Sequence, residues 1–121
     1  MHSNASLSDS QRQLLPLTPA VFFILLALAD GEKHGYAMMQ DVKTLSGGQM
    51  NMGPGTLYTT IQRLLDLALI VETAKSKSEE GRRRYYQLTA AGKVLLEAEI
   101  GRMDSLLRLA RQKNLKPLVV R

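Results

Sequence analysis

The chain has 121 residues, which is enough for one domain built around one hydrophobic core. It carries 16 Lys and Arg against 11 Asp and Glu, and the resulting net charge of +5 permits a polyanionic partner without requiring one. The absence of cysteine excludes disulfides, thiolate catalysis and cysteine-containing zinc sites, and it fits the reducing cytoplasm in which we expect the protein to reside.

The first 16 residues are expected to form an N-terminal arm. Residues 1–7 are small and polar, as is common in mobile chain ends. Ser8 or Ser10 can cap a short helix through Leu15, and Pro16 stops that helix because proline disfavours the helical conformation of the residue before it.

A second helix starts where a capping hydroxyl, Thr18, is followed by Pro19 at the first helical position. It runs to about Asp30, and Gly31 supplies the stop. The apolar run that it contains, residues 20–29, is about half as long as a membrane-spanning helix. The segment before this run also lacks the positive charge of a signal peptide, so no membrane partner is expected. Because the helix is apolar nearly all round, it should be buried on more than one side.

Two further helices are predicted in the middle of the chain. The first runs from Lys33 to Ser46 and ends at two glycines, after which residues 49–52 form a short strand or an extended link. The next opens at Gly53, and its apolar side chains recur at spacings that place them on one stripe: Leu57, Ile61, Leu64, Leu65 and Ala68. The other side of this helix carries hydroxyls and one cation: Thr56, Thr59, Thr60 and Arg63.

A basic β-hairpin follows, with strands from Ile70 to about Ser76 and from Arg82 to Leu88 around a turn at residues 77–81. It carries five cations, Lys75, Lys77, Arg82, Arg83 and Arg84, against three acidic residues. Since side chains alternate along a strand, Arg82 and Arg84 should share a face and Arg83 should take the other. Tyr85 and Tyr86 are expected to pack within the hairpin rather than to stack on bases. The alternative role for these charges is to block unwanted pairing of the sheet edge.

Thr89 caps a last long helix, from Ala90 to about Asn114. Apolar residues alternate along it at steps of four and three, as in a heptad seam: Leu96, Ile100, Met103, Leu107 and Ala110. A seam of two heptads is too short to be stable alone. We therefore expect it to pair with a second copy of the chain as a homodimer, and the alternative is that it folds back on its own domain.

The order helix, helix, helix, strand, turn, strand, helix predicts a mainly α protein with a small β-hairpin wing (α+β), a winged helix-turn-helix. We divide it into the N-terminal arm (1–16), a DNA-binding domain (17–88) and a C-terminal dimerisation helix and tail (89–121). In such a fold the third helix enters the major groove and the wing lies along the backbone or the minor groove. Hydroxyls on that helix can bond phosphates or base edges. The alternative is that they only solvate its outer face.

Other side chains of this region suit a phosphate partner. Tyr58 can donate its hydroxyl while its ring packs on the preceding helix, Arg63 can reach a phosphate, and the helix start at Gly55 and Thr56 offers free amides. An enzyme is not expected, because no nucleophile, acid and base can be grouped and Gly53-Pro54-Gly55 lacks the lysine of a P-loop. We expect no cofactor and no metal.

Three segments resemble the PadR-type bacterial transcription regulators. GPGTLYTTIQRLLDLALI resembles their recognition-helix motif, LTPAVFFILLALADGEKHGYAMMQDV the preceding helices, and GRRRYYQLTAAGKVLL the junction between wing and last helix. The resemblance covers about Leu17 to Met103. It implies a winged-helix fold, a homodimer through the C-terminal helix, and repression of target promoters. By matched position it implies DNA contacts from Tyr36, Gly55, Thr56, Tyr58 and Arg63, and wing contacts from Lys75, Lys77 and Arg82 to Arg84.

The sequence therefore predicts a sequence-specific, double-stranded DNA-binding regulator, a repressor that acts as a homodimer on a palindromic promoter site. One alternative is a ligand-responsive regulator with a small apolar or aromatic effector at the dimer interface. Phe22, Phe23, Met103 and Leu107 could line such a site, although a plain dimer core is the favoured reading of these residues. The other alternative is a winged-helix module that binds proteins.

Overall fold

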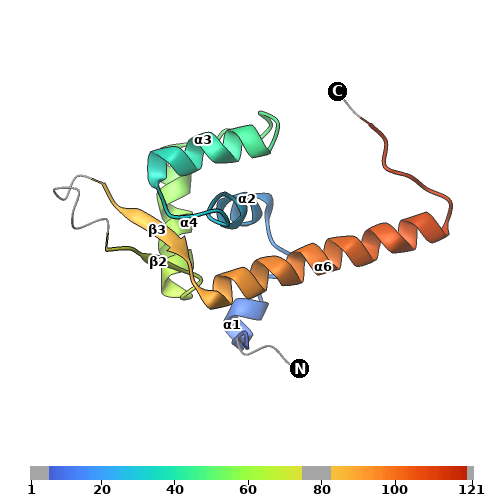
Figure 1. Cartoon of the computed structure of the whole chain (residues 1–121), viewed down its shortest axis with the longest axis horizontal. Coiled ribbons are helices and arrows are strands. Elements are labelled where there is room, and N and C mark those ends of the chain that lie inside the picture. Colours follow the sequence, from blue (N-terminus) through green and yellow to red (C-terminus); the bar gives the residue numbers. More distant parts are fainter. Residues whose placement is uncertain (1–5, 75–82, 120–121) are drawn as a thin grey trace.

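The computed structural model describes residues 6–74 and 83–119. A group of helices and a small sheet form one body, and the last helix runs out of it (Figure 1). In chain order the elements are α1 (Asp9–Arg12), α2 (Pro19–Ala27), β1 (Lys33–His34), α3 (Gly35–Leu45), α4 (Pro54–Asp66), β2 (Ile70–Glu72), β3 (Tyr85–Leu88) and α6 (Ala90–Gln112). The predicted class, mainly α with a small β part, is confirmed.

The predicted helix starts are confirmed by their capping hydrogen bonds. The hydroxyls of Ser8, Thr18 and Thr89 each accept from a backbone N–H three residues on, at 3.1, 3.2 and 3.0 Å. The helix ends are less well predicted. α1 ends at Arg12 rather than Leu15, and α2 ends at Ala27 rather than Asp30.

A three-stranded antiparallel sheet has the order β1-β3-β2. Its first strand was not predicted, because Lys33 and His34 were assigned to the start of a helix. In the structure His34 is the extended N-cap of α3, so this short extended piece is free to pair with Tyr85 and Tyr86 of β3. β2 ends at Glu72, and β3 begins at Tyr85 rather than Arg82. The predicted turn at residues 77–81 lies outside the described residues.

The core confirms the apolar patterns. In α4 the predicted stripe is buried at Leu57, Ile61 and Leu64, whereas Ala68 lies beyond the helix with a positive φ of 58°. α2 packs against both α3 and α6, as expected for a helix that is apolar nearly all round. Tyr85 and Tyr86 are 8% and 3% exposed, so their rings pack within the fold as predicted.

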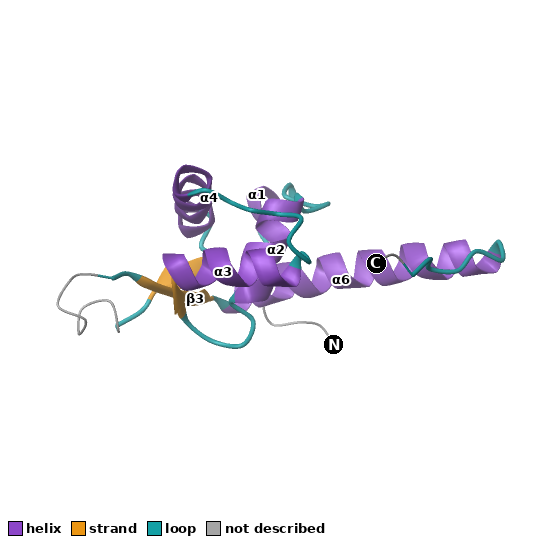
Figure 2. Cartoon of the chain, turned by 90° about the horizontal axis from the view of Figure 1, so that it is seen from above, coloured by secondary structure: helices purple, strands orange, loops and turns teal. Residues whose placement is uncertain are grey.

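α6 has two halves with different surroundings. Its first half packs on the domain and buries Leu95, Leu96 and Glu99. From Ile100 to Leu109 every residue is exposed, and Figures 1 and 2 show this half extending away from the other elements, at the opposite end of the molecule from the sheet. Within the described residues, no helix is both long and apolar enough to cross a membrane.

Candidate nucleic-acid interface

The N-terminal half of α4 presents an exposed polar face. Gly53 is the N-cap and has no side chain to cap the helix, and Pro54 occupies the first turn. The amides of the following residues therefore face outward, which makes the helix start suited to an anion. Gly55 is exposed, and nothing lies within 4 Å of the position that a Cβ would occupy there.

The predicted hydroxyl face of α4 is present, with one change. Thr56 and Thr59 are exposed, as is Arg63 near the end of the helix. Thr60 is half-buried, and its hydroxyl donates to the carbonyl of Thr56 at 2.8 Å. The proton of Thr60 is therefore used inside the helix, and its oxygen can offer a partner only an acceptor.

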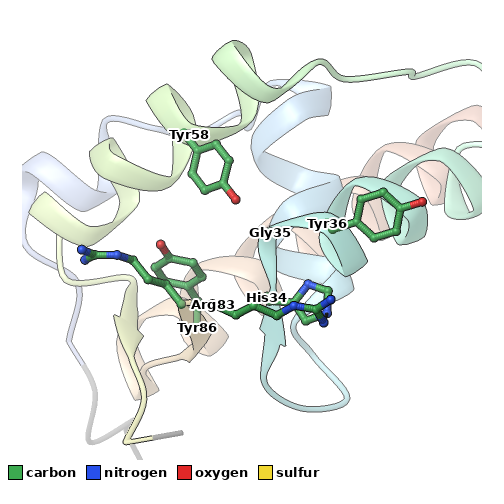
Figure 3. Close-up of a pocket in the computed structure, with 7 residues that line it drawn as sticks. His34, Gly35, Tyr36, Tyr58, Arg83 and Tyr86 are labelled. Atoms are coloured by element: carbon green, nitrogen blue, oxygen red, sulfur yellow. Dashed lines mark hydrogen bonds between the residues drawn. The ribbon is translucent and has the colours of Figure 1, made fainter. Parts of the chain in front are cut away.

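A cavity of about 390 Å³ opens beside this face, between α3, α4 and β3 (Figure 3). Its walls combine two arginines, three tyrosines, a histidine and a glycine: His34, Gly35, Tyr36, Tyr58, Arg83, Arg84 and Tyr86. Arg83 and Arg84 lie just before β3, β3 supplies Tyr86, β1 supplies His34, and the two helices supply the rest. The sheet and α4 therefore share one concave, basic surface.

Tyr58 packs over the start of α3, as predicted. A Cβ at Gly35 would collide with the Tyr58 hydroxyl, so glycine is required there for the two helices to approach. The hydroxyl of Tyr86 points toward Tyr58, whereas Tyr36 is 62% exposed and lies at the rim of the cavity with its hydroxyl directed away from these two tyrosines (Figure 3). Burial, with a smaller contribution from Glu72, raises the pKa of Tyr86, so this hydroxyl stays protonated and can donate.

His34 and Arg83 contact each other at the edge of the same space. The Nδ1 atom of His34 lies 3.2 Å from the Ala37 N–H, which donates to it, and Arg83 Nη1 lies 3.0 Å from the Nε2 atom of the same ring. A guanidinium can only donate, and a neutral imidazole has one accepting nitrogen, so the two contacts use alternative tautomers of His34. The remaining N–H groups of Arg83 can bind an acceptor.

Arg83 and Arg84 contact different neighbouring strands and both line the cavity, so the predicted alternation of faces among Arg82, Arg83 and Arg84 stays a prediction. Arg83 faces His34 of β1, whereas Arg84 contacts Glu72 of β2 at 3.4 Å and keeps 72% of its side chain exposed. An ion pair this exposed contributes little to stability, so the Arg84 guanidinium can exchange its partner readily. The other predicted wing residues, Lys75, Lys77 and Arg82, lie outside the described residues.

Sequence reasoning missed His34 and Tyr86 as members of this surface. The signal for His34 was local, because a histidine before Gly-Tyr-Ala can cap a helix through Nδ1. The position of Tyr86 depends on the pairing of β1 with β3, for which two residues give no periodicity.

The predicted dimerisation seam is only partly on the surface. Leu96 is 4% exposed, because the first turns of α6 pack on their own domain. The assignment of Leu96 to the dimer seam is therefore corrected. Ile100, Met103 and Leu107 are 46%, 39% and 39% exposed, and Ala110 is half-buried. Leu106 and Leu109 widen this exposed apolar row.

A comparison with protein families matches residues 24–98 to the "Transcriptional regulator PadR-like family". The chain belongs to this family. Membership makes it a PadR-like transcriptional regulator, a class whose name implies regulation through DNA. The family-level expectation from the sequence is thereby confirmed.

Individual relatives agree with this assignment. The chain is 40% identical over 87 residues to an uncharacterized 37.1 kDa protein in transposon TN4556 of Streptomyces fradiae, which covers 72% of this chain but only 24% of that protein. It is 36% identical over 86 residues to the Transcriptional regulator Rv3488 of Mycobacterium tuberculosis, covering 70% of this chain and 76% of that one.

A solved structure shows the same fold. A PadR family transcription regulator from Clostridium difficile R20291 superposes with a TM-score of 0.65 at 23% identity, covering 81% of this chain and 100% of that chain. The predicted winged-helix fold is confirmed by this match.

Proposed function

We propose that this PadR-like protein is a sequence-specific, double-stranded DNA-binding repressor that acts in the cytoplasm as a homodimer on a palindromic promoter site. One observation carries the proposal: the exposed hydroxyl face of α4 and the basic cavity beside it form a continuous surface through Tyr58. A helix that presents small polar side chains next to a basic hairpin matches the way winged helices hold duplex DNA.

In this proposal α4 enters the major groove. Thr56 and Thr59 bond base edges or phosphates, and their methyl groups touch thymine methyls. The amides at Gly55 and Thr56 receive a phosphate oxygen at the helix start. Arg63 reaches a phosphate farther along the same strand. Thr60 contributes only as an acceptor, because its proton is bonded to Thr56.

The cavity receives the sugar–phosphate backbone. The guanidinium of Arg83, placed beside His34, binds a phosphate oxygen through its remaining N–H groups, and the hydroxyls of Tyr58 and Tyr86 supply further donors. Arg84 reaches the neighbouring phosphate after leaving Glu72. Tyr36, on the outer rim, meets the backbone at its edge. Three further cations of the wing are proposed to contact DNA because of their positive charge: Lys75, Lys77 and Arg82.

The dimer follows from the exposed apolar row of α6. The apolar side chains between Ile100 and Leu109 are exposed to water in the single chain. Their burial against a second copy would stabilise the dimer by about 25 cal/mol per Å² of apolar surface removed from water. A two-fold dimer presents two copies of α4, which suits half-sites about 34 Å apart or a multiple of that distance. Occupation of a promoter by this dimer blocks polymerase.

The proposal is tested by selecting bound duplexes from a random pool and measuring affinity for the selected site. If the dimer contacts about six to ten phosphates, log affinity falls against log salt concentration with a slope of about −5 to −9. Arg84→Glu and Arg82→Glu should weaken duplex binding and leave the dimer, measured by light scattering, intact. Binding that ignores both salt and these charge reversals would instead support a protein-binding module.

One observation favours a second candidate function, a ligand-responsive regulator. A groove of about 580 Å³ with largely apolar walls lies between the end of α2, β3 and α6, and Ile100 extends it onto the exposed row. A small apolar or aromatic effector bound there would change how α6 leaves the domain. Its walls include Leu26 and Leu88 but not the predicted Phe22 and Phe23. Hydrophobic aromatics that raise the melting temperature and release DNA together would support this candidate.

A further inference from the structure

The C-terminal end of α4 is held by two elements from distant parts of the sequence. The three residues after Asp66 lie past the last turn of α4, so hydrogen bonds of the helix do not reach their backbone carbonyl groups. The carbonyl of Leu67 accepts from the Gln11 side-chain amide at 2.8 Å. The carbonyl of Ala68 accepts from the Thr89 hydroxyl at 2.7 Å, and that of Leu69 accepts from the Thr89 N–H at 3.1 Å. One contact therefore comes from α1 and two come from the cap of α6.

The contact from α6 is a tight one. A Cβ on Gly92, in the first turn of α6, would collide with the carbonyl oxygen of Leu69. The segment that follows α4 and the first turn of α6 therefore meet backbone to backbone at this point. The contact from α1 fixes the same turn from another direction.

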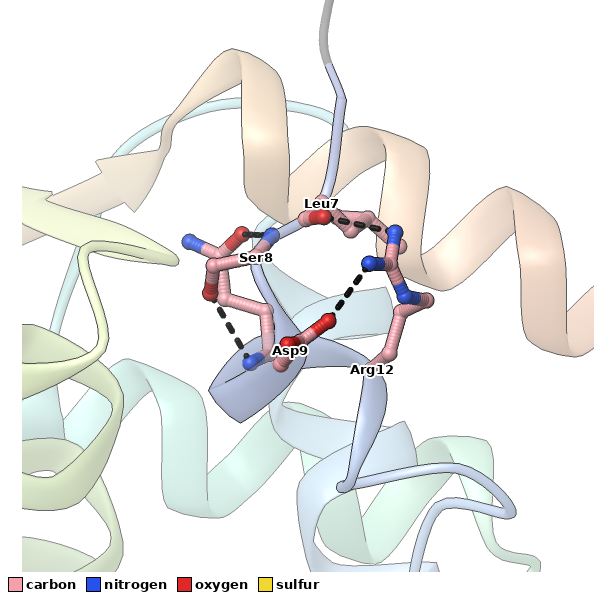
Figure 4. Close-up of polar contacts among 5 residues, drawn as sticks. Leu7, Ser8, Asp9 and Arg12 are labelled. Carbon is pink, nitrogen blue, oxygen red and sulfur yellow. Dashed lines mark hydrogen bonds and ion pairs between the residues drawn. The ribbon is translucent and has the colours of Figure 1, made fainter.

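Gln11 is built into α1 by its own side chain. Its Oε1 accepts from the Ser8 N–H at 2.9 Å, and the Ser8 hydroxyl accepts from the Gln11 N–H at 3.1 Å. The bond from the Ser8 N–H fixes the Gln11 side chain with its amide nitrogen toward Leu67, and the bond to the Ser8 hydroxyl caps the helix. On the outer side, Arg12 donates to the Leu7 carbonyl and to Asp9, at 2.7 and 2.8 Å (Figure 4).

The placement of Gln11 has an energetic consequence. Gln11 is 9% exposed, so loss of the Leu67 contact would leave its buried amide unpaired. A helix of four residues is not stable alone. α1 is ordered by docking, through this bond and through Leu7, Leu14 and Leu15, which pack against the core.

We propose that α1 is a positioning element for α4 and that Gln11 is its positioning residue. By fixing the last turn of α4 against the start of α6, Gln11 sets the angle between the two helices. In a dimer joined through α6, that angle determines how far apart the two copies of α4 lie. The proposal rests on the proposed DNA-binding dimer. It concerns a segment that precedes residues 24–98, the part matched by the family.

Two variants distinguish the bond from Gln11 to Leu67 from the bonds that Gln11 makes within α1. Gln11→Glu keeps an oxygen for the Ser8 N–H but removes the donor to Leu67. Ser8→Ala is the matched control, because it removes a hydroxyl of α1 and leaves the donor to Leu67 in place. Affinity is measured for the selected operator and for two operators whose half-sites are one base pair closer together or farther apart. All measurements are made where both variants remain folded.

We expect Gln11→Glu to weaken binding to the selected operator about tenfold and to reduce its preference over the shifted operators. Ser8→Ala should retain that preference. A loss that is equal on all three operators would overturn the proposal, because it would show that Gln11 does not set the spacing between the two copies of α4.

A second measurement needs no DNA. The chain lacks cysteine, so Gln62→Cys on α4 and Arg111→Cys on α6 give two spin-label sites, and labelled chains are diluted into unlabelled ones. Gln11→Glu should broaden the distance distribution between the labels, and Ser8→Ala should not. Broadening in a protein that fails to bind any duplex would refute the DNA-binding proposal while supporting the positioning role. An unchanged distribution would refute the positioning role.

Discussion

Glycines of this chain serve different purposes at the level of single residues. Gly35 and Gly92 are required by the fold, because a Cβ would meet the Tyr58 hydroxyl at the first and the Leu69 carbonyl at the second. Gly55 has open space around it and lies in a helix, where glycine costs up to about 1 kcal/mol relative to alanine. The fold alone does not explain Gly55, whereas close approach of a DNA backbone would.

Gly55→Ala should therefore separate stability from binding. We expect the free energy of unfolding to rise by up to about 1 kcal/mol, because alanine is the better helix former. Affinity for the selected operator should fall about tenfold, because a methyl group then stands between helix and phosphate. Denaturant unfolding and fluorescence anisotropy measure the two effects.

The matched control is Gly101→Ala, since Gly101 is also helical, exposed and surrounded by open space. It should stabilise the protein without changing operator affinity. Unchanged affinity in Gly55→Ala would show that no backbone group of DNA approaches this residue.

Glu99 gives the stability of the protein a predictable pH dependence. Its side chain is 1% exposed and accepts two hydrogen bonds from Arg102, at 2.7 and 2.8 Å. These bonds lower the pKa of Glu99 against the opposing effect of burial. Because the folded-state pKa is depressed, the stabilisation is present above the unfolded value, about 4.3, and is lost as the pH falls through the folded-state value.

In the wild type, the free energy of unfolding should fall between about pH 5 and the lowest pH at which the protein folds. Glu99→Gln should make this fall smaller. Glu97→Gln, an exposed substitution on the same helix, should leave that fall nearly unchanged. Urea unfolding across this pH range measures both. Parallel curves for wild type and Glu99→Gln would contradict the assigned role of the Arg102 contact.

At the level of the elements, the sequence predicted what local rules determine. The caps at Thr18 and Thr89 and the stripe of α4 follow from short-range hydrogen bonding and periodicity, and they are present. β1 was missed because two residues carry no pattern and pair only with distant Tyr85 and Tyr86. The contact of Gln11 with Leu67 spans 56 residues, so no local signal could have found it.

The candidate site shows the same division between local and distant causes. Exposure of Thr56, Thr59 and Arg63 follows from the helical period of α4. The approach of Arg83 to His34 depends on the sheet register, which sets strands together that are far apart in the sequence. Leu96 was assigned to a partner because it continues the heptad pattern, but the same pattern also serves packing within one domain.

The exposed half of α6 should control assembly. Met103→Glu or Leu107→Glu places a charge in the exposed apolar row, and we expect it to convert the dimer to monomers because burial of an unpaired charge is costly. Light scattering after size exclusion measures the change, and tight operator binding should be lost with it. Ser105→Glu, exposed on the same helix but outside the row, should do neither. A wild-type monomer at micromolar concentration would refute the proposed role of the row.

At the level of the whole molecule, the two proposed contact regions lie far apart. The sheet lies at one end, and the exposed half of α6 extends at the other (Figures 1 and 2). The basic cavity lies beside the sheet. Between them, the backbone of Leu69, just after α4, approaches Gly92 in the first turn of α6 too closely for a Cβ to fit, and we infer that this contact couples the orientations of the two helices. A change in how two α6 helices cross would therefore move the two copies of α4 as rigid arms.

If the two copies of α4 are held rigidly, binding should depend strictly on the spacing between the half-sites of the operator. Insertion of five base pairs between the half-sites rotates one of them by about half a helical turn, so only one copy of α4 can reach its groove. We expect affinity to fall by about two orders of magnitude or more, approaching that of a single half-site. Gel-shift titration with matched duplexes measures this. Equal affinity for both spacings would show that the protein binds half-sites independently.

The apolar row on α6 also bears on how the regulator responds to its own abundance. If two chains must meet before an operator is held, occupancy at concentrations below the dimer's dissociation constant rises with the square of the chain concentration. Halving synthesis would then lower occupancy about fourfold rather than twofold. In that case a side-chain pattern on one helix would give a promoter a steep response to small changes in protein level, without a ligand or a second regulator.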